Sequence, residues 1–189
     1  RIPAPMYRRM KDIHGKGTPL VPVAVFGNRA VDDALQEMAD LAKKNGFRVV
    51  GGAEMVAPHS LDRRFGAGRP DEKDIAQLKV FLHALMSREE LRDVPMPGSH
   101  DYKEYKGLPI YPHSGIHCSG CGTCSAECPA DAIDQGDPRK PDKSKCISCM
   151  RCITVCPFGA RSVPKAAQLA VSAALAAMCS GHKSPSFYL

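Results

Sequence analysis

Apolar residues in the first 87 positions recur at helical spacing in three places. The first of these opens with prolines and the other two open with acidic residues, which are start signals for helices. We therefore predict three amphipathic helices in this part of the chain. Their expected inner stripes are Met6, Met10 and Ile13; Leu35, Met38, Leu41 and Ala42; and Ile75, Leu78, Leu82 and Leu85.

Two short apolar runs separate these helices, VPVAVF at 21–26 and FRVVGGAEMVA at 47–57. A uniformly apolar run such as 21–26 is typical of a strand that is buried on both faces of a parallel sheet. The order helix, strand, helix, strand, helix is that of a parallel α/β sheet with crossover connections. Such a strand needs a neighbouring strand on each edge, and a sheet of only two strands cannot provide this. We therefore expect residues 1–87 to be the C-terminal part of a longer α/β domain that begins with strands outside this sequence.

Two further segments flank a cysteine-rich region. Residues 88–116 are rich in proline, glycine and tyrosine without helical periodicity, which predicts an extended linker. We expect Tyr102, Tyr105 and Tyr111 to pack this linker onto a domain surface. Residues 164–189 form an Ala-rich helix followed by a tail, and the helix is apolar nearly all round, so we expect it to pack in a groove or between domains.

Between them, residues 117–163 contain two runs that repeat cysteine for cysteine at an interval of 28 positions, each of the form C-x2-C-x2-C-x3-C-P. The three closely spaced thiolates of a run can wrap one face of an iron-sulfur cube, while the fourth points to the other cluster. The spacing therefore predicts a unit with pseudo-twofold symmetry that holds two [4Fe-4S] clusters. The expected ligands are Cys118, Cys121, Cys124 and Cys156 for cluster 1, and Cys146, Cys149, Cys152 and Cys128 for cluster 2.

Zinc and disulfides are the alternative uses of these cysteines. A structural zinc ribbon needs four cysteines, not two sets of four that each end in Cys-Pro. Disulfides fit the even number in the two runs, but not a reducing compartment. The ninth cysteine, Cys179, lies outside both runs at the end of the Ala-rich helix and is expected to be a small buried apolar residue.

The formal net charge of +6 has little meaning for partners, because Lys and Arg are scattered and form no basic stripe interleaved with aromatic residues. We therefore predict no nucleic-acid partner. No apolar run approaches the roughly 20 residues that cross a bilayer, and no secretory signal is present. The sequence predicts a cytoplasmic protein without membrane insertion.

Residues 117–163 resemble bacterial-type ferredoxins with two [4Fe-4S] clusters, most closely in the run CISCMRCITVCPFGA. Over the whole chain, the order of VPVAVFGNRAVDD, the linker HDYKEYKGLPIYP, the cysteine runs and the ending SPSFYL resembles a family of anaerobes and archaea in which a flavodoxin-like domain is fused to a ferredoxin. The resemblance implies an α+β protein with part of a flavodoxin-like parallel sheet at 1–87 and a ferredoxin domain at 117–163.

A flavodoxin-like domain would bring FMN with it. The residues that match the loop beside the flavin ring in such domains are Gly27, Asn28, Arg29 and Ala30. A Gly-Asn pair after a strand is equally an ordinary turn between strand and helix. The resemblance therefore implies FMN for the full-length protein, with an alternative interpretation of these four residues left open.

Electron transfer through the two clusters to and from redox partner proteins is the predicted function, with a flavin as the coupled group. The alternative is a flavin-dependent reductase in which the ferredoxin part feeds electrons to the flavin. No Ser-His-Asp, paired-carboxylate or H-E-x-x-H arrangement is found, so we predict no catalytic residues.

Overall fold

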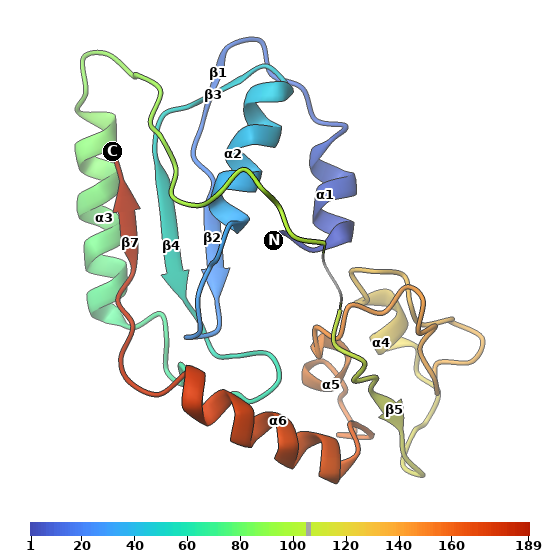
Figure 1. Ribbon diagram of the computed structural model, residues 1–189. Helices are drawn as coiled ribbons and strands as arrows, with labels where there is room; N and C mark the ends of the chain where they lie inside the picture. Colours follow the sequence, from blue (N-terminus) through green and yellow to red (C-terminus); the bar gives the residue numbers. More distant parts are fainter. Residues whose placement is uncertain (105–106) are drawn as a thin grey trace. The chain divides into compact units, whose positions relative to one another are not determined.

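The computed structural model describes residues 1–104 and 107–189, which form two compact units (Figure 1). Of the described residues, the first unit takes 1–59, 63–104 and 178–189, and the second takes 60–62 and 107–177. The chain is a mixed α/β protein with small sheets in these ranges. No helix in the described part of the chain is both long and apolar enough to cross a membrane.

The first unit contains both predicted strand regions and one strand that the sequence did not predict. The run at 21–26 holds β2 (Val23–Phe26), which begins after Pro22, and β1 (Thr18–Leu20) precedes that run. The run at 47–57 is divided into β3 (Phe47–Val49) and β4 (Gly52–Val56). The pairs β1–β3 and β2–β4 are parallel, while β7 lies antiparallel on the other edge of β4. The elements of this unit are α1 (Ala4–Met10), β1 (Thr18–Leu20), β2 (Val23–Phe26), α2 (Ala34–Lys44), β3 (Phe47–Val49), β4 (Gly52–Val56), α3 (Glu72–Met86) and β7 (Ser186–Tyr188).

The expectation that the strand at 21–26 is buried on both faces is wrong for this structure. In the described sheet of order β2-β4-β7, β2 is an edge strand, and only Ala24 of its side chains is buried. Val23 is 46% exposed and Val25 is 66% exposed. The central position is taken by β4, because the C-terminal residues supply its second neighbour as β7.

Helix α2 shows the face that its periodicity predicts. Leu35, Met38, Leu41 and Ala42 are all buried, and they form the core of this unit together with residues such as Val49. The core therefore lies between α2 and the parallel strand pairs, as expected for an amphipathic helix on a sheet.

Helix α3 is rotated relative to its predicted stripe. Ile75 and Leu82 are exposed, while Phe81 and Leu85 are buried. Phe81 stacks on Phe187 of β7 with ring centroids 5.1 Å apart. The partner that selects this face comes from the far end of the chain, so the local pattern could not identify it.

The N-terminus of α3 is held by a capping box. The Asp71 side chain accepts hydrogen bonds from the backbone N–H groups of Lys73 and Asp74, and Asp74 accepts one from the backbone of Asp71. Arg69 donates two further hydrogen bonds to the buried Asp74 carboxylate. That guanidinium, acting first through its hydrogen bonds, holds the pKa of Asp74 below its ordinary value.

The first part of the predicted linker is extended and packs on the first unit. Val94 and Met96 are buried in its core, and the Val94 N–H donates to the Val49 carbonyl at 2.8 Å. The Tyr102 hydroxyl donates to Asp40 of α2, and the Arg1 guanidinium lies over the Tyr102 ring. Tyr105 lies outside the described residues.

The second unit consists of short elements around the two cysteine runs. Strands β5 and β6 pair antiparallel, with Ser114 opposite Arg161. Ile133 and Pro141 form an isolated antiparallel bridge, and Ile133 precedes Arg161 by the same 28 positions that separate the two runs. The pairing is therefore duplicated with the cysteines. The elements are β5 (His113–Ser114), α4 (Thr123–Ala126), α5 (Arg151–Thr154), β6 (Arg161–Ser162) and most of α6 (Lys165–Met178).

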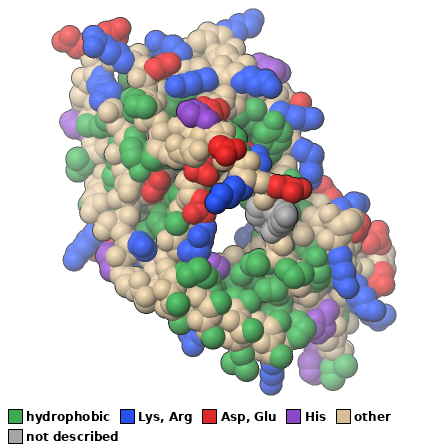
Figure 2. All heavy atoms as spheres, in the orientation of Figure 1, with side chains coloured by type: hydrophobic (Ala, Val, Ile, Leu, Met, Phe, Trp, Pro, Cys, Tyr) green, Lys and Arg blue, Asp and Glu red, His purple; other side chains and the backbone are tan. Residues whose placement is uncertain are grey.

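The predicted Ala-rich helix is present as α6, but its expected burial is wrong. Leu175 is its buried residue, whereas Leu169 is 71% exposed. Hydrophobic side chains gather on the surface over this part of the molecule (Figure 2). Alanine has the highest helix propensity, so the segment can be helical without wide contact. Cys179, which follows the helix, is buried as expected, and burial raises the pKa of its thiol.

Candidate functional site

The two cysteine runs share an unusual backbone path. Each run contains two residues with positive φ and is followed by a third two positions after its Cys-Pro pair, and each such residue has its counterpart 28 positions away. Alternation of left-handed residues with ordinary ones turns successive N–H groups toward a common centre, which forms an anion-binding nest. The pairs are Gly120 (φ 73°) with Ser148 (55°), Gly122 (74°) with Met150 (60°), and Asp131 (50°) with Gly159 (57°).

A short helix follows each nest and buries one cysteine. α4 begins after Gly122 and places Cys124, while α5 begins after Met150 and places Cys152. These two cysteines are both 8% exposed and pack together with Ile133. The buried centre of this unit thus lies between the two runs.

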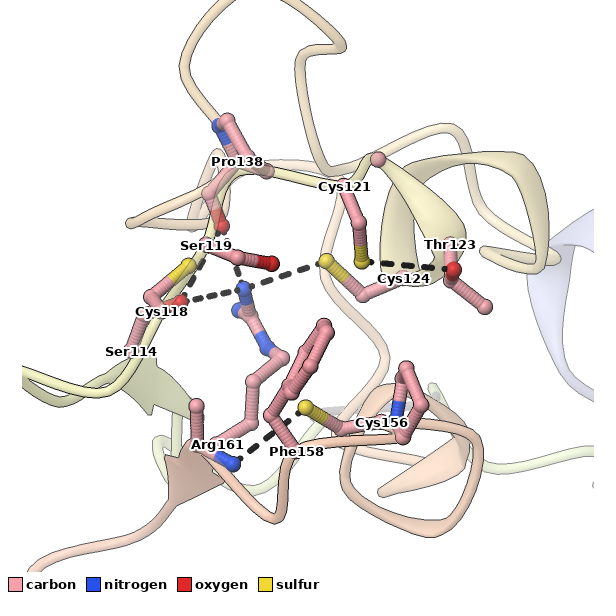
Figure 3. Close-up of a pocket in the computed structure, with 13 residues that line it drawn as sticks. Ser114, Cys118, Ser119, Cys121, Thr123, Cys124, Pro138, Cys156, Phe158 and Arg161 are labelled. Atoms are coloured by element: carbon pink, nitrogen blue, oxygen red, sulfur yellow. Dashed lines mark hydrogen bonds between the residues drawn. The ribbon is translucent and has the colours of Figure 1, made fainter.

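The eight cysteines of the runs line two hollows, four to each. Three cysteines of one run share a hollow with the fourth cysteine of the other run, so each run contributes to both. Figure 3 shows the first hollow, with the sulfur atoms of Cys118, Cys121, Cys124 and Cys156 on its walls. The second hollow is lined by Cys128, Cys146, Cys149 and Cys152.

Backbone N–H groups point at the exchanged cysteines, which are the fourth cysteine of each run, Cys128 and Cys156, and line the hollow of the other run. The Ala132 N–H donates to Cys128 Sγ at 3.3 Å, and the Ala160 N–H donates to Cys156 Sγ at the same distance. Hydrogen bonds of this kind stabilise negative charge on sulfur. Each hollow therefore has a built-in donor at the cysteine that arrives from the other run.

Polar groups surround the outer thiols of the first run. The Gly120 N–H and then the Ser114 hydroxyl hold the pKa of the Cys118 thiol below its ordinary value. The Thr123 hydroxyl, 3.4 Å from Cys121 Sγ, does the same for the pKa of Cys121. Metals bind the thiolate, so both thiols are biased toward the ligating form.

In the second run, burial has the opposite effect. Desolvation raises the pKa of Cys146 and of Cys152, although the charge of Arg161 acts to lower both. Each hollow therefore contains four cysteine sulfur atoms, but the surroundings of these atoms differ between the two hollows.

Arg161 is a residue of the site that sequence reasoning missed. Its side chain is buried, at 3% exposure, and it enters the wall of the first hollow (Figure 3). Nη1 donates to Cys124 Sγ at 3.5 Å, to Ser114 Oγ at 3.1 Å and to the Pro138 carbonyl. Nη2 donates to the Pro112 carbonyl at 3.1 Å. Comparison of the two repeats offered a signal, because the counterpart of this charged residue is the apolar Ile133.

The donor set suits a bulky, sulfur-rich anionic group. Within residues 1–104 and 107–189, no three His, Cys, Asp or Glu side chains converge as they would around one metal ion. The cysteines instead share the walls of two hollows, each with backbone donors to sulfur, and one has a buried guanidinium. Four thiolates, N–H donors and a dry wall are what an iron-sulfur cluster requires.

The residues considered for FMN are engaged within the first unit. Asn28 has φ 59° and is buried, and its Nδ2 donates to the Cys179 carbonyl at 2.7 Å and to the Gly181 carbonyl at 2.9 Å. A Cβ on Gly27 would lie 2.6 Å from the His59 Cα. Arg29 pairs with Asp32, and Ala30 is exposed. This turn therefore anchors the C-terminal tail.

Comparison with known proteins identifies the cysteine region. A family described as a 4Fe-4S dicluster domain matches residues 117–160. A ferredoxin-like protein in the nif region of Sinorhizobium fredii is 37% identical over 54 residues, which cover 25% of this chain and 84% of that protein. The chain belongs to the ferredoxin-like proteins. Its 4Fe-4S ferredoxin-like domain contains both cysteine runs.

A larger protein shares this ferredoxin-like segment. One component of the Na(+)-translocating ferredoxin:NAD(+) oxidoreductase complex of Acetobacterium woodii is 44% identical over 57 residues. The match covers 29% of this chain and 17% of that component, so the chain spans less than a fifth of this relative. No solved structure matches the chain significantly.

Proposed function

We propose that this protein transfers single electrons between redox partner proteins by means of two [4Fe-4S] clusters held in the two hollows. The observation that carries the proposal is the arrangement of eight cysteines in two groups of four, each completed by a cysteine from the other run. Cluster 1 is assigned to Cys118, Cys121, Cys124 and Cys156, and cluster 2 to Cys146, Cys149, Cys152 and Cys128. When bound, each cluster supplies a centre that gains or loses one electron without making or breaking a bond to substrate.

The chain's own residues hold and shield these centres. The left-handed residues of each nest direct N–H groups toward the sulfurs, and Ala132 and Ala160 donate to the exchanged cysteines. Ile133 and Ile153 pack around the buried Cys124 and Cys152, which keeps water from the region between the hollows. Little rearrangement is needed when charge changes in so constrained a site, and this favours rapid electron transfer.

Partner proteins supply and accept the electrons in this proposal. The name of the Acetobacterium woodii relative describes one part of an oxidoreductase complex, which supports a role among other redox proteins. The cysteine hollows lie close to the surface, since Cys121 and Phe158 at the first hollow are exposed. An exposed edge of this kind suits a brief encounter with a partner.

Two experiments test the proposal on anaerobically purified protein. Metal analysis should find about eight irons and about eight sulfides per chain, as two cubanes require. A protein that contains stoichiometric zinc and no iron would refute the proposal. Next, Cys128→Ser should remove the cluster held by residues 146–152 and reduce iron by about half, while the cluster held by 118–124 remains.

The matched variants are Cys156→Ser and Cys179→Ala. Cys156→Ser should produce the reverse pattern, with loss of the first cluster and retention of the second. Cys179 lines neither hollow, so Cys179→Ala should leave the iron content unchanged. EPR spectra and hyperfine-shifted cysteine proton signals distinguish the clusters. Damage to the first cluster in Cys128→Ser contradicts the ligand assignment.

Coupling of the clusters to FMN is a finer proposal. Its support is the resemblance together with the parallel pairing of β2 with β4, because Gly27 follows the carboxyl end of β2, where α/β sheets bind ligands. Gly27, Asn28, Arg29 and Ala30 would then contribute mainly backbone groups, since the Asn28 amide donates to the tail. Fluorescence of acid-released flavin tests the idea on the purified full-length protein. About one FMN per chain supports this proposal, and full-length protein that contains no FMN refutes it.

A further inference from the structure

We infer that the two centres have unequal reduction potentials and that Arg161 is the positioning residue that makes the first centre the more easily reduced. The inference rests on the proposed function, since it concerns clusters in the two hollows. It goes further by assigning a distinct role to each cluster and by naming a residue outside the ligand set.

The two hollows are related by the 28-residue repeat, so their walls can be compared position by position. The cysteines, the prolines after the fourth cysteine and the N–H donors Ala132 and Ala160 are the same in both. Five further pairs of matched positions differ: the first hollow has the smaller residue at three of them and a charged residue in place of an apolar one at a fourth, whereas Phe158 replaces an alanine at the fifth. The pairs, first hollow before second, are Ser119 and Ile147, Gly122 and Met150, Thr123 and Arg151, Phe158 and Ala130, and Arg161 and Ile133.

The last pair contributes the largest electrostatic difference. Arg161 and Ile133 are both buried, so a full positive charge stands in one hollow where the other has a hydrocarbon side chain. Within the described residues Arg161 has no carboxylate partner, and its Nε has no hydrogen-bond partner. Its charge is therefore offset only by carbonyl, hydroxyl and sulfur dipoles. Arg151 in the second hollow is exposed and pairs with Glu127.

A buried positive charge favours whichever redox state is more negative. Reduction adds one negative charge to a cluster, and the interaction is stronger inside a protein than in water. Hydrogen bonds to sulfur act in the same direction, whereas an apolar wall opposes the added charge. The first hollow has the guanidinium with its bond to Cys124 Sγ, and the second has Ile147, Met150 and Ile133.

The charge of Arg161 also lies near the second run, because Cys124, to which it donates, packs together with Cys152. Its direct hydrogen bond, however, goes to Cys124, and its side chain lines the first hollow and not the second. Both potentials should therefore rise with this charge, with the larger effect at the first centre. An electron arriving at the domain would rest preferentially on that centre.

Arg161 also fastens the loops at Pro112 and Pro138, so a variant must separate charge from structure. Arg161→Gln keeps a hydrogen-bond donor and removes the charge. Arg161→Lys keeps the charge and loses the planar array of donors. If the residue were merely structural, both variants would reduce stability and neither would alter the difference between the two potentials.

The experiment is a redox titration of the anaerobic iron-loaded full chain, followed by EPR and by the cysteine proton signals of each cluster. In the wild-type protein the first centre should be reduced before the second. Arg161→Gln should reduce the ratio of reduced to oxidised first centre at a fixed potential by about tenfold, which is about 59 mV for one electron. Arg161→Lys should remain within about threefold of wild type, because it keeps the charge.

The control is Arg92→Gln, the same chemical change at a side chain 80% exposed in the first unit, which should move neither potential. Equal effects of Arg161→Gln on both centres, or prior reduction of the second centre in wild type, overturn the inference. If Arg161→Gln does not fold, the wild-type order still tests which centre is reduced first, and Arg161→Lys tests the role of the charge by keeping that order. Absence of iron-sulfur clusters in wild type instead refutes the proposed function, while full loading with equal potentials refutes only this inference.

Discussion

The two units of this chain are stabilised in different ways. The first unit buries a connected set of apolar side chains from α2, its strands and the segment containing Val94 and Met96. The buried cluster of the second unit comprises Cys124, Ile133 and Cys152, so two of its three members are thiols from the site. A domain with so small an apolar core usually depends on metals or disulfides. From this comparison we predict that, in the second unit, folding depends on cluster binding.

The largest expected effect is that of iron removal. Removal of iron by a chelator should unfold the cysteine-run region of the second unit while the first unit stays folded. The reason is that bound clusters take the place of a hydrophobic core in the second unit, whereas the first unit has an apolar core of its own. Hydrogen exchange followed by mass spectrometry on the whole chain should show rapid exchange at 117–163 and retained protection in α2 and β4. Retained protection in both units would show that the second unit does not need its metals.

A core truncation in the first unit should produce the complementary result. Leu35 is fully buried on α2, so Leu35→Ala should lower the free energy of unfolding of this unit by about 3 kcal/mol. Iron content should stay unchanged. Leu169→Ala, at a side chain 71% exposed, is the matched control with an effect below about 0.5 kcal/mol. Urea denaturation followed by circular dichroism measures both, and iron loss in Leu35→Ala contradicts the separation of the units.

The next effect concerns a buried polar network in the first unit. The Asp74 carboxylate pairs with Arg69 and also takes part in the α3 capping box. Asp74→Asn removes its negative charge and should lower the free energy of unfolding by about 2 kcal/mol. The pKa of Asp74 is lower in the folded state, so its contribution is present above the unfolded pKa of about 4 and is lost as pH falls through the folded pKa. Denaturation midpoints measured from pH 7 down to pH 2 should therefore converge for wild type and Asp74→Asn at low pH. A constant difference contradicts the ionic contribution.

The smallest effect belongs to a surface ion pair of the second unit. Arg151 and Glu127 lie 2.6 Å apart, but both side chains are about half exposed. Arg151→Gln should change the unfolding free energy of the iron-loaded protein by no more than about 0.5 kcal/mol, since water screens such pairs. Thermal unfolding at low and high salt measures it. A loss several times larger would mean that ion pairs, and not ligands alone, hold this unit together.

Local patterns predicted the features that depend on near neighbours in the chain. The buried face of α2 followed from helical spacing, and the helix at 165–178 followed from its alanines. The 28-residue repeat located the cysteine region, and the left-handed residues of the structure recur at the same interval. Such features depend on periodicity and spacing, which can be seen directly in the amino-acid sequence.

Long-range partners decided the rest. β7 pairs with β4 across more than a hundred residues, and through Phe187 it turns α3 onto the face that contains Phe81. Arg161 is buried because the carbonyls of Pro112 and Pro138 meet its guanidinium. The residues that line each cysteine hollow come from distant positions of the chain, and only folding brings them together. The cysteine pattern thus specified what chemistry the domain can hold, while the packed chain specified how unlike the two hollows are.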